Sequence, residues 1–265
     1  MKASASISRK NRRPKGRARA TFEATVKRSD TDAPHASLIL FDIDGTLVLT
    51  GGAGRRAMSL AFEDVLGVRD AFSSLPMAGR TDSWILSDAV AAHGVPLDTS
   101  TVARFHEVYL RRLKVEIERP GDSRKGIMPG IRELLDALAG QDAVYLALLT
   151  GNFEAAARLK LEYFDLWRYF RCGAFGDAAP DRNGLLPRAV STVAACGGPA
   201  FAATDAVVIG DTPLDIACAK FSSARSIGVA TGMHSVDDLR QAGADIVFSD
   251  LSDTRSVLRA LNVLL

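Results

Sequence analysis

The sequence has few of the features that mark secreted or membrane proteins. It contains 3 cysteines, an odd and widely spaced set that argues against a disulfide framework and against a zinc cluster. Its longest run without a charged residue, Ala189 to Thr204, has 16 residues and contains a Gly-Gly-Pro break, which is too short for a membrane span. Residues 1–20 carry charges where a signal peptide needs an apolar segment. We therefore expect a reduced, cytoplasmic protein that does not associate with a membrane.

Positive charge is concentrated at the start of the chain. Residues 1–32 hold ten Lys or Arg and three Asp or Glu, a balance of +7 that leaves −5 for the remainder of a chain whose total is +2. Few large apolar residues lie in this segment, so we expect residues 1–35 to be a basic, disordered tail. An organelle transit peptide and a non-specific nucleic-acid arm have similar compositions, and the role of the tail stays open. No specific nucleic-acid partner is expected.

An apolar strand that ends in two acids is the most informative part of the chain. Residues 38–41 (Leu-Ile-Leu-Phe) are predicted to form a buried strand, and Asp42 and Asp44 follow it. Two carboxylates cannot be buried there without neutralisation or a cation. A carboxylate can attack phosphorus and form an aspartyl-phosphate, so Asp42 is the candidate nucleophile. Residues two apart in an extended chain point the same way, so Asp44 can protonate the leaving oxygen and later activate water.

Two alternatives apply to this segment when it is taken alone. An Asp-Gly pair, here Asp44 and Gly45, is most often a hairpin turn. A calcium loop beginning at Asp42 needs Gly at its sixth position and Glu at its twelfth, and those positions hold Leu47 and Ala53. Calcium binding is therefore set aside, and the turn remains the alternative.

The strand followed by DIDGTL resembles the first motif of the haloacid dehalogenase superfamily of hydrolases. A second apolar strand, residues 146–149, ends in Thr150-Gly151-Asn152, and 108 residues separate Asp42 from Thr150. That gap fits an inserted cap. The resemblance implies that the Thr150 hydroxyl, with Gly151 and Asn152, holds the phosphoryl oxygens. Taken alone, the motif is equally compatible with a strand-to-helix turn in which Thr150 lies near an N-cap.

A third apolar strand leads into the last motif. Residues 207–210 precede Asp211, and Pro213 suits the first turn of a helix, which places Asp215 one turn into that helix. Mg²⁺ prefers octahedral oxygen ligands and retains several waters, which a few carboxylates around a phosphate can satisfy. Without the resemblance, Asp215 is more simply a first-turn acid favoured by the helix dipole. The resemblance implies these Mg²⁺ ligands: Asp42, the backbone carbonyl of Asp44, Asp211, and Asp215 either directly or through one water.

The remaining motif of the family supplies a cation, usually lysine, and here the sequence departs from the family. The region 181–188 contains Arg182 and Arg188 but no lysine. Arg182 lies just before an apolar helical stretch, whereas Arg188 lies within it and can be a solvated helix residue. We therefore choose Arg182 as the phosphate-site cation, with Arg188 as the alternative. Arginine offers a planar fork of donors rather than a point charge.

The apolar runs predict the core of the fold. Alternating with helical segments, they are typical of an α/β protein with a Rossmann-like parallel sheet flanked by helices, the core fold of the resembling superfamily. Ligands of such sheets bind beyond the carboxyl ends of the strands, where all the motif residues fall. We place this core at residues 36–50 and 126–265. The predicted strands are residues 38–41, 144–149, 206–210, 226–230 and 245–248.

The segment 51–125 is predicted to be a small α-helical cap inserted into the core. It has no long apolar strand, and its apolar residues recur at three- and four-residue spacing near 55–66, 81–93 and 99–118. The family uses such a cap to close over the site and to contact the leaving group. By resemblance, Arg80 and Thr81 face the site, and Arg80 can grip a second anionic group. A surface arginine at a helix start is an equally weighted alternative for Arg80.

These patterns favour a magnesium-dependent phosphatase acting on a small phosphorylated metabolite, similar to the phosphoglycolate phosphatases, or on a sugar phosphate. A dehalogenase is less expected, because that chemistry does not use the acid/base that Asp44 supplies. A phosphomutase of the β-phosphoglucomutase type retains both aspartates and remains an alternative. A non-catalytic module that binds a phospho-ligand or nucleic acid is the other alternative, although none of the motif aspartates is missing.

Overall fold

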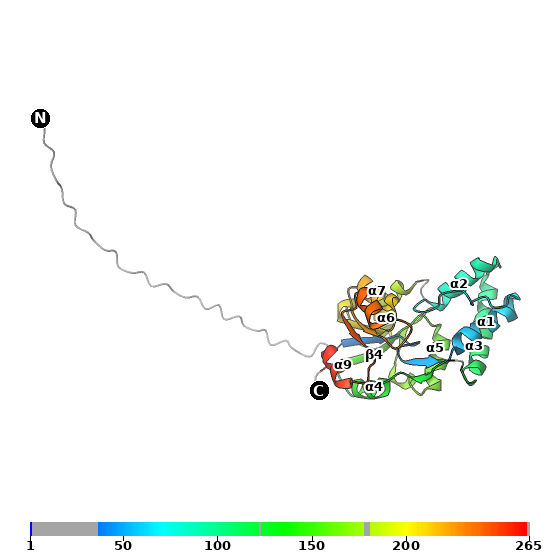
Figure 1. The fold of residues 1–265 in the computed structure, drawn as a ribbon. Coiled ribbons are helices and arrows are strands. Elements are labelled where there is room, and N and C mark those ends of the chain that lie inside the picture. Colours follow the sequence, from blue (N-terminus) through cyan, green and yellow to red (C-terminus); the bar gives the residue numbers. More distant parts are fainter. Residues whose placement is uncertain (2–36, 122, 178–180, 264–265) are drawn as a thin grey trace. The chain divides into compact units, whose positions relative to one another are not determined.

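The computed structural model describes Met1 and residues 37–121, 123–177 and 181–263. The chain divides into two units, Met1–Ala33 and Pro34–Leu265. Apart from Met1, the predicted basic tail lies outside the described residues. The second unit contains a sheet of six parallel strands (Figure 1). In spatial order these strands are β5 (Gly173–Ala174), β4 (Val144–Leu149), β1 (Ser37–Phe41), β6 (Ala206–Gly210), β7 (Arg225–Val229) and β8 (Ile246–Phe248).

Helices cover both faces of this sheet. Successive side chains of a strand point to opposite faces, so Ile39 and Phe41 of β1 enter one apolar cluster while Leu38 and Leu40 enter another. The first cluster includes residues of α4 (Ile131–Ala139) and α9 (Thr254–Ala260), and the second includes residues of α6 (Leu185–Ala195) and α7 (Pro213–Phe221). Figure 1 shows these two pairs on opposite sides of the sheet. Burial on both faces explains why the strands are almost continuously apolar. The helices around the sheet are α4 (Ile131–Ala139), α5 (Glu154–Tyr163), α6 (Leu185–Ala195), α7 (Pro213–Phe221), α8 (Val236–Gln241) and α9 (Thr254–Ala260).

The remaining helices form a cap with its own core. They lie in the sequence between β2 (Val48–Thr50) and β3 (Lys125–Ile127), which pair as an antiparallel ribbon. Figure 1 shows them grouped beside the sheet rather than stacked on either of its faces. Phe62 and Phe105 are fully buried in their apolar cluster, and Phe153 at the start of α5 joins it from the core. The cap helices are α1 (Ala53–Leu66), α2 (Asp82–His93) and α3 (Thr99–Glu116).

The predicted fold class, a parallel α/β sheet with an inserted helical cap, is confirmed. Each predicted strand and cap helix begins and ends within about two residues of its observed bounds. The sequence did not indicate the two-residue strand β5, the three-residue strands β2 and β3, or the 3-10 helices η1 (Trp167–Tyr169), η2 (Arg182–Gly184) and η3 (Ala203–Asp205). Segments this short fall below the roughly four residues over which a hydrophobic pattern can be recognised. In the described part of the chain, no helix has the length and apolarity that a membrane crossing requires.

A pair of glycine substitutions tests how closely the core is packed. Gly130 and Gly67 both have left-handed backbones, with φ of 78° and 74°. A Cβ on Gly130 would overlap the Leu251 carbonyl, whereas one on Gly67 would meet nothing within 4 Å. Gly67→Ala should therefore cost only the backbone strain, about 1 kcal/mol, and Gly130→Ala about 3 kcal/mol. Urea unfolding of both variants measures the difference, and equal losses would contradict the close contact.

Candidate active site

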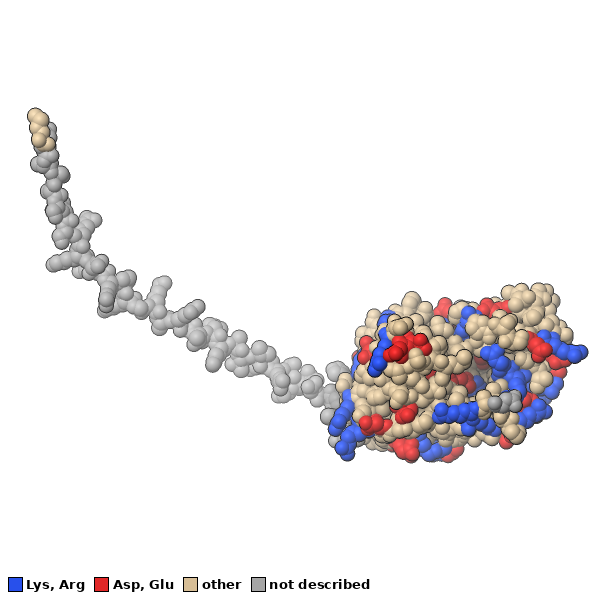
Figure 2. Space-filling view, viewed as in Figure 1, with Lys and Arg blue, Asp and Glu red and all other residues tan. Residues whose placement is uncertain are grey.

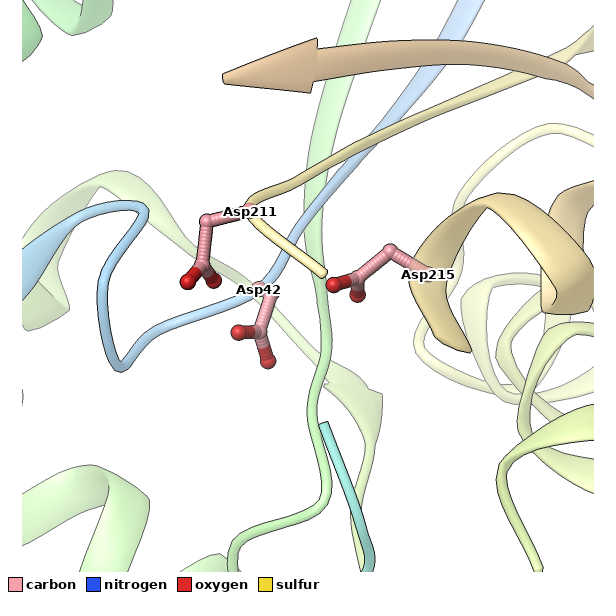
Figure 3. Close-up of side chains that lie close together, drawn as sticks. All are labelled: Asp42, Asp211 and Asp215. Carbon is pink, nitrogen blue, oxygen red and sulfur yellow. The ribbon is translucent and has the colours of Figure 1, made fainter. Parts of the chain in front are cut away.

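Three carboxylates meet at the carboxyl edge of the sheet. Asp42 follows β1, Asp211 follows β6, and Asp215 lies in the first turn of α7. One oxygen from each lies within 4.8 Å of the others, and Figure 3 shows the three groups turned toward a common region. Their exposed fractions are only 4%, 3% and 1%. Parallel strands end at the same edge, which is how residues 169 positions apart come into contact.

The local sequence allows these side chains to approach so closely. Gly45 has φ of 91°, and a Cβ there would collide with the Asp211 carboxylate. A Cβ on Gly232 would overlap the same carboxylate. Thr46 Oγ1 donates a hydrogen bond of 3.2 Å to Asp211 Oδ1. Asp211 is therefore held in a pocket made by two glycines and one hydroxyl.

Asp215 has two functions in the structure. Its Oδ2 accepts hydrogen bonds from the Thr212 backbone N–H at 3.0 Å and from Thr212 Oγ1 at 2.7 Å. The Asp215 backbone N–H in turn donates to Thr212 Oγ1 at 3.4 Å, which completes a capping box at the start of α7. Its Oδ1 pairs with Arg182. The predicted first-turn acid and the predicted site residue are thus the same side chain.

Arg182 is the cation inside this carboxylate cluster. It begins η2 and is 3% exposed. Its Nη2 lies 2.9 Å from Asp42 Oδ1 and also pairs with Asp215, while its Nη1 donates to the Gly79 carbonyl at 3.0 Å. Arg188, the alternative, is exposed on α6. Of the two arginines, the structure brings Arg182 to the predicted nucleophile.

Burial makes the charged forms of Asp42 and Asp211 unfavourable. It raises the pKa of Asp42 to about 6, although Arg182 acts in the opposite direction and Asp215 adds to the rise. It raises the pKa of Asp211 well above its ordinary value, with further contributions from Asp215 and Asp42. Three carboxylates and one guanidinium leave two negative charges, which a divalent cation can balance. The donors are all oxygens, the ligands that Mg²⁺ prefers, so the residues fit the predicted metal.

A second charged cluster lies beside the first. Lys160 on α5 is 4% exposed, and its Nζ donates to Asp44 Oδ2 and to Asn152 Oδ1, both at 2.6 Å. Asn152 Nδ2 donates at 2.8 Å both to Asp44 Oδ2 and to Thr150 Oγ1. Three residues predicted for the site, Asp44, Thr150 and Asn152, are thus joined in one hydrogen-bonded network. Lys160 was not among the predicted residues.

The sequence contained a signal for Lys160. On α5, the buried positions are Ala156, Ala157, Lys160 and Leu161, so the lysine occupies the apolar stripe of the helix. A lysine at such a position is almost never fully buried unless it is paired. Its partners come from segments distant in sequence, so the stripe predicts the burial but not the partners.

The cap contacts the core through the start of α2. Thr81 is the N-cap of this helix, with its hydroxyl accepting from the Trp84 N–H at 3.2 Å. The Asp82 N–H donates to the Gly151 carbonyl at 2.7 Å, and Asp82 Oδ2 accepts from the Phe153 N–H at 2.9 Å. The predicted substrate-binding residues Thr81 and Gly151 are therefore neighbours.

Arg80 is held by the cap itself. Its Nη1 lies 2.5 Å from Asp88 Oδ2, and its guanidinium carbon lies 4.3 Å from the centre of the Trp84 ring. Core and cap together enclose a cavity of about 500 Å³. Its lining includes Asp42, Asp44, Lys160 and Arg182 from the core and Met58, Arg80 and Ile85 from the cap.

A model of the haloacid dehalogenase-like hydrolase family matches residues 39–220. The chain belongs to this family. Within the haloacid dehalogenase-like hydrolases, the probable phosphatase IndB of Dickeya dadantii is 34% identical over 236 residues, which cover 84% of this chain and 94% of that relative. The phosphoglycolate phosphatase of Agrobacterium fabrum is 28% identical over 223 residues, which cover 84% of this chain and 92% of that one.

The solved structure of CbbY from Rhodobacter sphaeroides in complex with phosphate has the same fold. Its TM-score is 0.61 at 20% sequence identity, and the match covers 82% of this chain and 96% of that one. The predicted family is thus confirmed, and so is the predicted reaction class, hydrolysis of phosphoric monoesters by a haloacid dehalogenase-like enzyme.

Removal of Arg182 should unbalance the buried carboxylates of this haloacid dehalogenase-like site. Arg182→Met leaves Asp42 and Asp215 buried without their cation, so we expect the free energy of unfolding to fall by about 3 kcal/mol in the absence of divalent metal. Arg188→Met, at an exposed position, should change it by less than about 0.5 kcal/mol. Urea unfolding in chelator compares the two variants. Equal effects would show that the buried pairings of Arg182 contribute little.

The buried carboxyl of Asp82 should make stability depend on pH. Burial raises its pKa from 3.8 to about 7, despite the opposing effects of Lys160 and the Phe153 N–H and with smaller increases from Asp44 and Asp177. As the pH falls, the folded protein therefore takes up this proton at a higher pH than the unfolded chain does. The contribution of Asp82 to the free energy of unfolding thus rises as the pH falls from about 7 to about 4. Asp82→Asn, which keeps an oxygen acceptor, should reduce that rise by up to about 4 kcal/mol. Unfolding measured at pH 5 and pH 8 tests this, and identical pH dependence in both proteins would refute it.

Proposed function

We propose that the protein is a magnesium-dependent phosphatase of a small phosphorylated metabolite and that it acts through an aspartyl-phosphate on Asp42. The observation that carries the proposal is the buried cluster of Asp42, Asp211 and Asp215 around Arg182, at the edge of a cavity lined by both core and cap. A phosphate ester that enters this cavity meets a carboxylate nucleophile and a guanidinium at one point.

Asp42 attacks phosphorus in this scheme, and Arg182 neutralises the phosphoryl oxygens. The pairing of Arg182 with Asp42 at 2.9 Å fixes the nucleophile, and Nε of Arg182 is buried without a hydrogen-bond partner among the described residues. That nitrogen is a donor that a phosphoryl oxygen can satisfy. The Thr150 hydroxyl, together with Gly151 and Asn152, holds the other oxygens.

Asp44 acts as the general acid and base at the leaving group. Its side chain is 41% exposed, in contrast to the buried Asp42, and it lines the cavity. As an acid it gives a proton to the leaving oxygen, and as a base it takes a proton from the water that then attacks the aspartyl-phosphate. A carboxylate that alternates between these two states needs access to solvent, which its exposure provides.

Asp42, the backbone carbonyl of Asp44, and Asp211 would hold Mg²⁺. Both oxygens of Asp215 already have partners in Arg182 and Thr212, which supports its contact with the metal through a water rather than directly. When bound, Mg²⁺ neutralises charge on the phosphate and orients it toward the nucleophile.

The cap supplies the rest of the substrate site. Arg80 and Thr81 are proposed to contact the substrate from the start of α2, and the cap is proposed to span residues 51–125, with the core formed by 36–50 and 126–265. The phosphoglycolate phosphatase of Agrobacterium fabrum supports a small substrate of that kind, and a sugar phosphate is the other candidate. A cytoplasmic location remains our expectation for an enzyme acting on such metabolites.

Phosphate release across a panel of phosphorylated metabolites, with and without Mg²⁺, tests the proposed function. We expect release that requires Mg²⁺ and that falls by at least about 1,000-fold in Asp42→Asn, because an amide is a poor nucleophile. Asp237→Asn, an exposed acid in α8, is the matched control and should retain turnover. Appreciable activity in Asp42→Asn would remove Asp42 from its role, and no release from any compound would favour the phosphomutase or the binding module.

A further inference from the structure

Lys160 is a second buried cation at the site, and the chemistry above does not use it. It reaches the site from α5, and 4% of its surface is exposed. Among the described residues, its ammonium donates hydrogen bonds to Asp44 and Asn152, each at 2.6 Å. Burying an ammonium costs free energy unless a carboxylate accompanies it, so the position of this lysine has to be maintained by its partners.

The two buried cations serve different ends of the bond to be broken. Arg182 pairs with Asp42 and Asp215, on the side where phosphorus is attacked. Lys160 pairs with Asp44, the residue that faces the leaving group. A cation on that side contacts the leaving group rather than the transferred phosphoryl group.

The ammonium of Lys160 has one N–H donor that its present partners do not use. Lys160 and Asn152 donate to the same oxygen, Asp44 Oδ2, so the other oxygen of Asp44 can serve the leaving group while these hydrogen bonds persist. An ammonium has three N–H donors, and among the described residues Lys160 uses two of them, on Asp44 and Asn152. An anionic group on the substrate can accept a hydrogen bond from the third.

There is room beside the ammonium for such a group. Gly54, in the first turn of α1, approaches it: a Cβ built there would lie 3.4 Å from Lys160 Nζ and 3.9 Å from Tyr109 Oη. The absence of a side chain at Gly54 leaves this side of Lys160 open, and Gly54, Tyr109 and Lys160 all line the cavity. In Figure 2, Lys and Arg side chains gather over the part of the visible face where Figure 1 places α1, α3 and α5, which favours entry of an anion.

Arg80, the other candidate for this role, is already engaged within the cap. Its guanidinium pairs with Asp88 and lies over the Trp84 ring. Neither partner takes part in the reaction. The ammonium of Lys160, in contrast, lies beside Asp44, which serves the leaving group, and it has a third N–H donor for the substrate.

We propose that Lys160 determines specificity by binding a carboxylate attached to the carbon that bears the phosphoester oxygen. Such a carboxylate lies within reach of Lys160 because the ammonium is only 2.6 Å from one oxygen of Asp44, the residue that serves the leaving group. The substrate class is then a short phosphorylated 2-hydroxy acid. This inference rests on the proposed function for the placement of the phosphate, and it narrows the choice between an acid and a sugar.

Ligand binding without turnover tests the inference. In an Asp42→Asn background with Mg²⁺ present, calorimetry would measure the dissociation constants of phosphoglycolate and of its neutral carboxamide, which has the same shape. We expect phosphoglycolate to bind about 30-fold more tightly, the usual effect of a hydrogen bond to a charged group. Adding Lys160→Met should reduce this ratio to about 3 or less. Because Arg80 is itself proposed to contact the substrate, adding Arg80→Met instead should weaken the binding of both ligands alike and leave the ratio above about 10.

The remaining outcomes overturn the proposal. It is overturned if Lys160→Met leaves the ratio unchanged or lowers the affinity for both ligands equally. It is also overturned if the ratio collapses in the Arg80→Met protein, or if neither ligand binds. Lys160→Gln provides a second variant if Lys160→Met does not fold, as judged by its thermal unfolding. Failure of the proposed phosphatase would be seen separately, as no phosphate release by the wild-type enzyme while the binding ratio still depends on Lys160.

Discussion

The pairing of one buried guanidinium with two buried carboxylates is the constraint on which the rest of the site depends. Asp42 directly follows the central strand β1, so the sheet fixes its position. The cation that neutralises it therefore has to come from another segment of the chain. Arg182 does so from the segment that follows β5, and it also pairs with Asp215 at the start of α7. One side chain therefore joins three elements of the core. A site built in this way carries its charges in fixed positions before any substrate arrives, which is what electrostatic stabilisation of a phosphoryl transfer requires.

The second cluster makes the two ends of the site chemically different. On one side of the site, Lys160 and Asn152 donate hydrogen bonds to an oxygen of Asp44. On the other side, Arg182 pairs with Asp42. Thr150 is hydrogen-bonded to Asn152 and directly follows Leu149, whose carbonyl accepts from Arg182 Nη2 at 3.4 Å, so the end of β4 contacts both clusters. In the proposed function, the phosphoryl end and the leaving-group end of an ester thus meet different cations with different geometry, a planar fork at one end and a point charge at the other.

The sequence predicted the parts of this arrangement that depend on local pattern. The acids at strand ends, such as Asp42 and Asp211, could be found because a carboxylate directly after a buried apolar strand needs a cation or a proton to be stable there. Lys160 could not be assigned to the site, because its partners Asp44 and Asn152 meet it only after α5 packs against the core and the cap. Asp82 was missed for the same reason: a first-turn acid on a helix is common, and only the fold reveals that it accepts a hydrogen bond from Phe153.

The backbones of the cap and the core also contact each other directly, with no side chain between them. Gly51 and Gly121, on the two segments that connect the cap to the core, lie so close that a Cβ on either would be under 3.0 Å from the Cα of the other. A Cβ on Gly151 would overlap the Arg80 carbonyl, so the start of α2 lies directly on the loop after β4. The predicted substrate-binding residues of the cap and the predicted phosphate-binding loop are therefore in backbone contact. A shift of α2 away from this loop would break the hydrogen bond from the Asp82 N–H to the Gly151 carbonyl, and this links the position of the cap to the residues proposed to hold the phosphate.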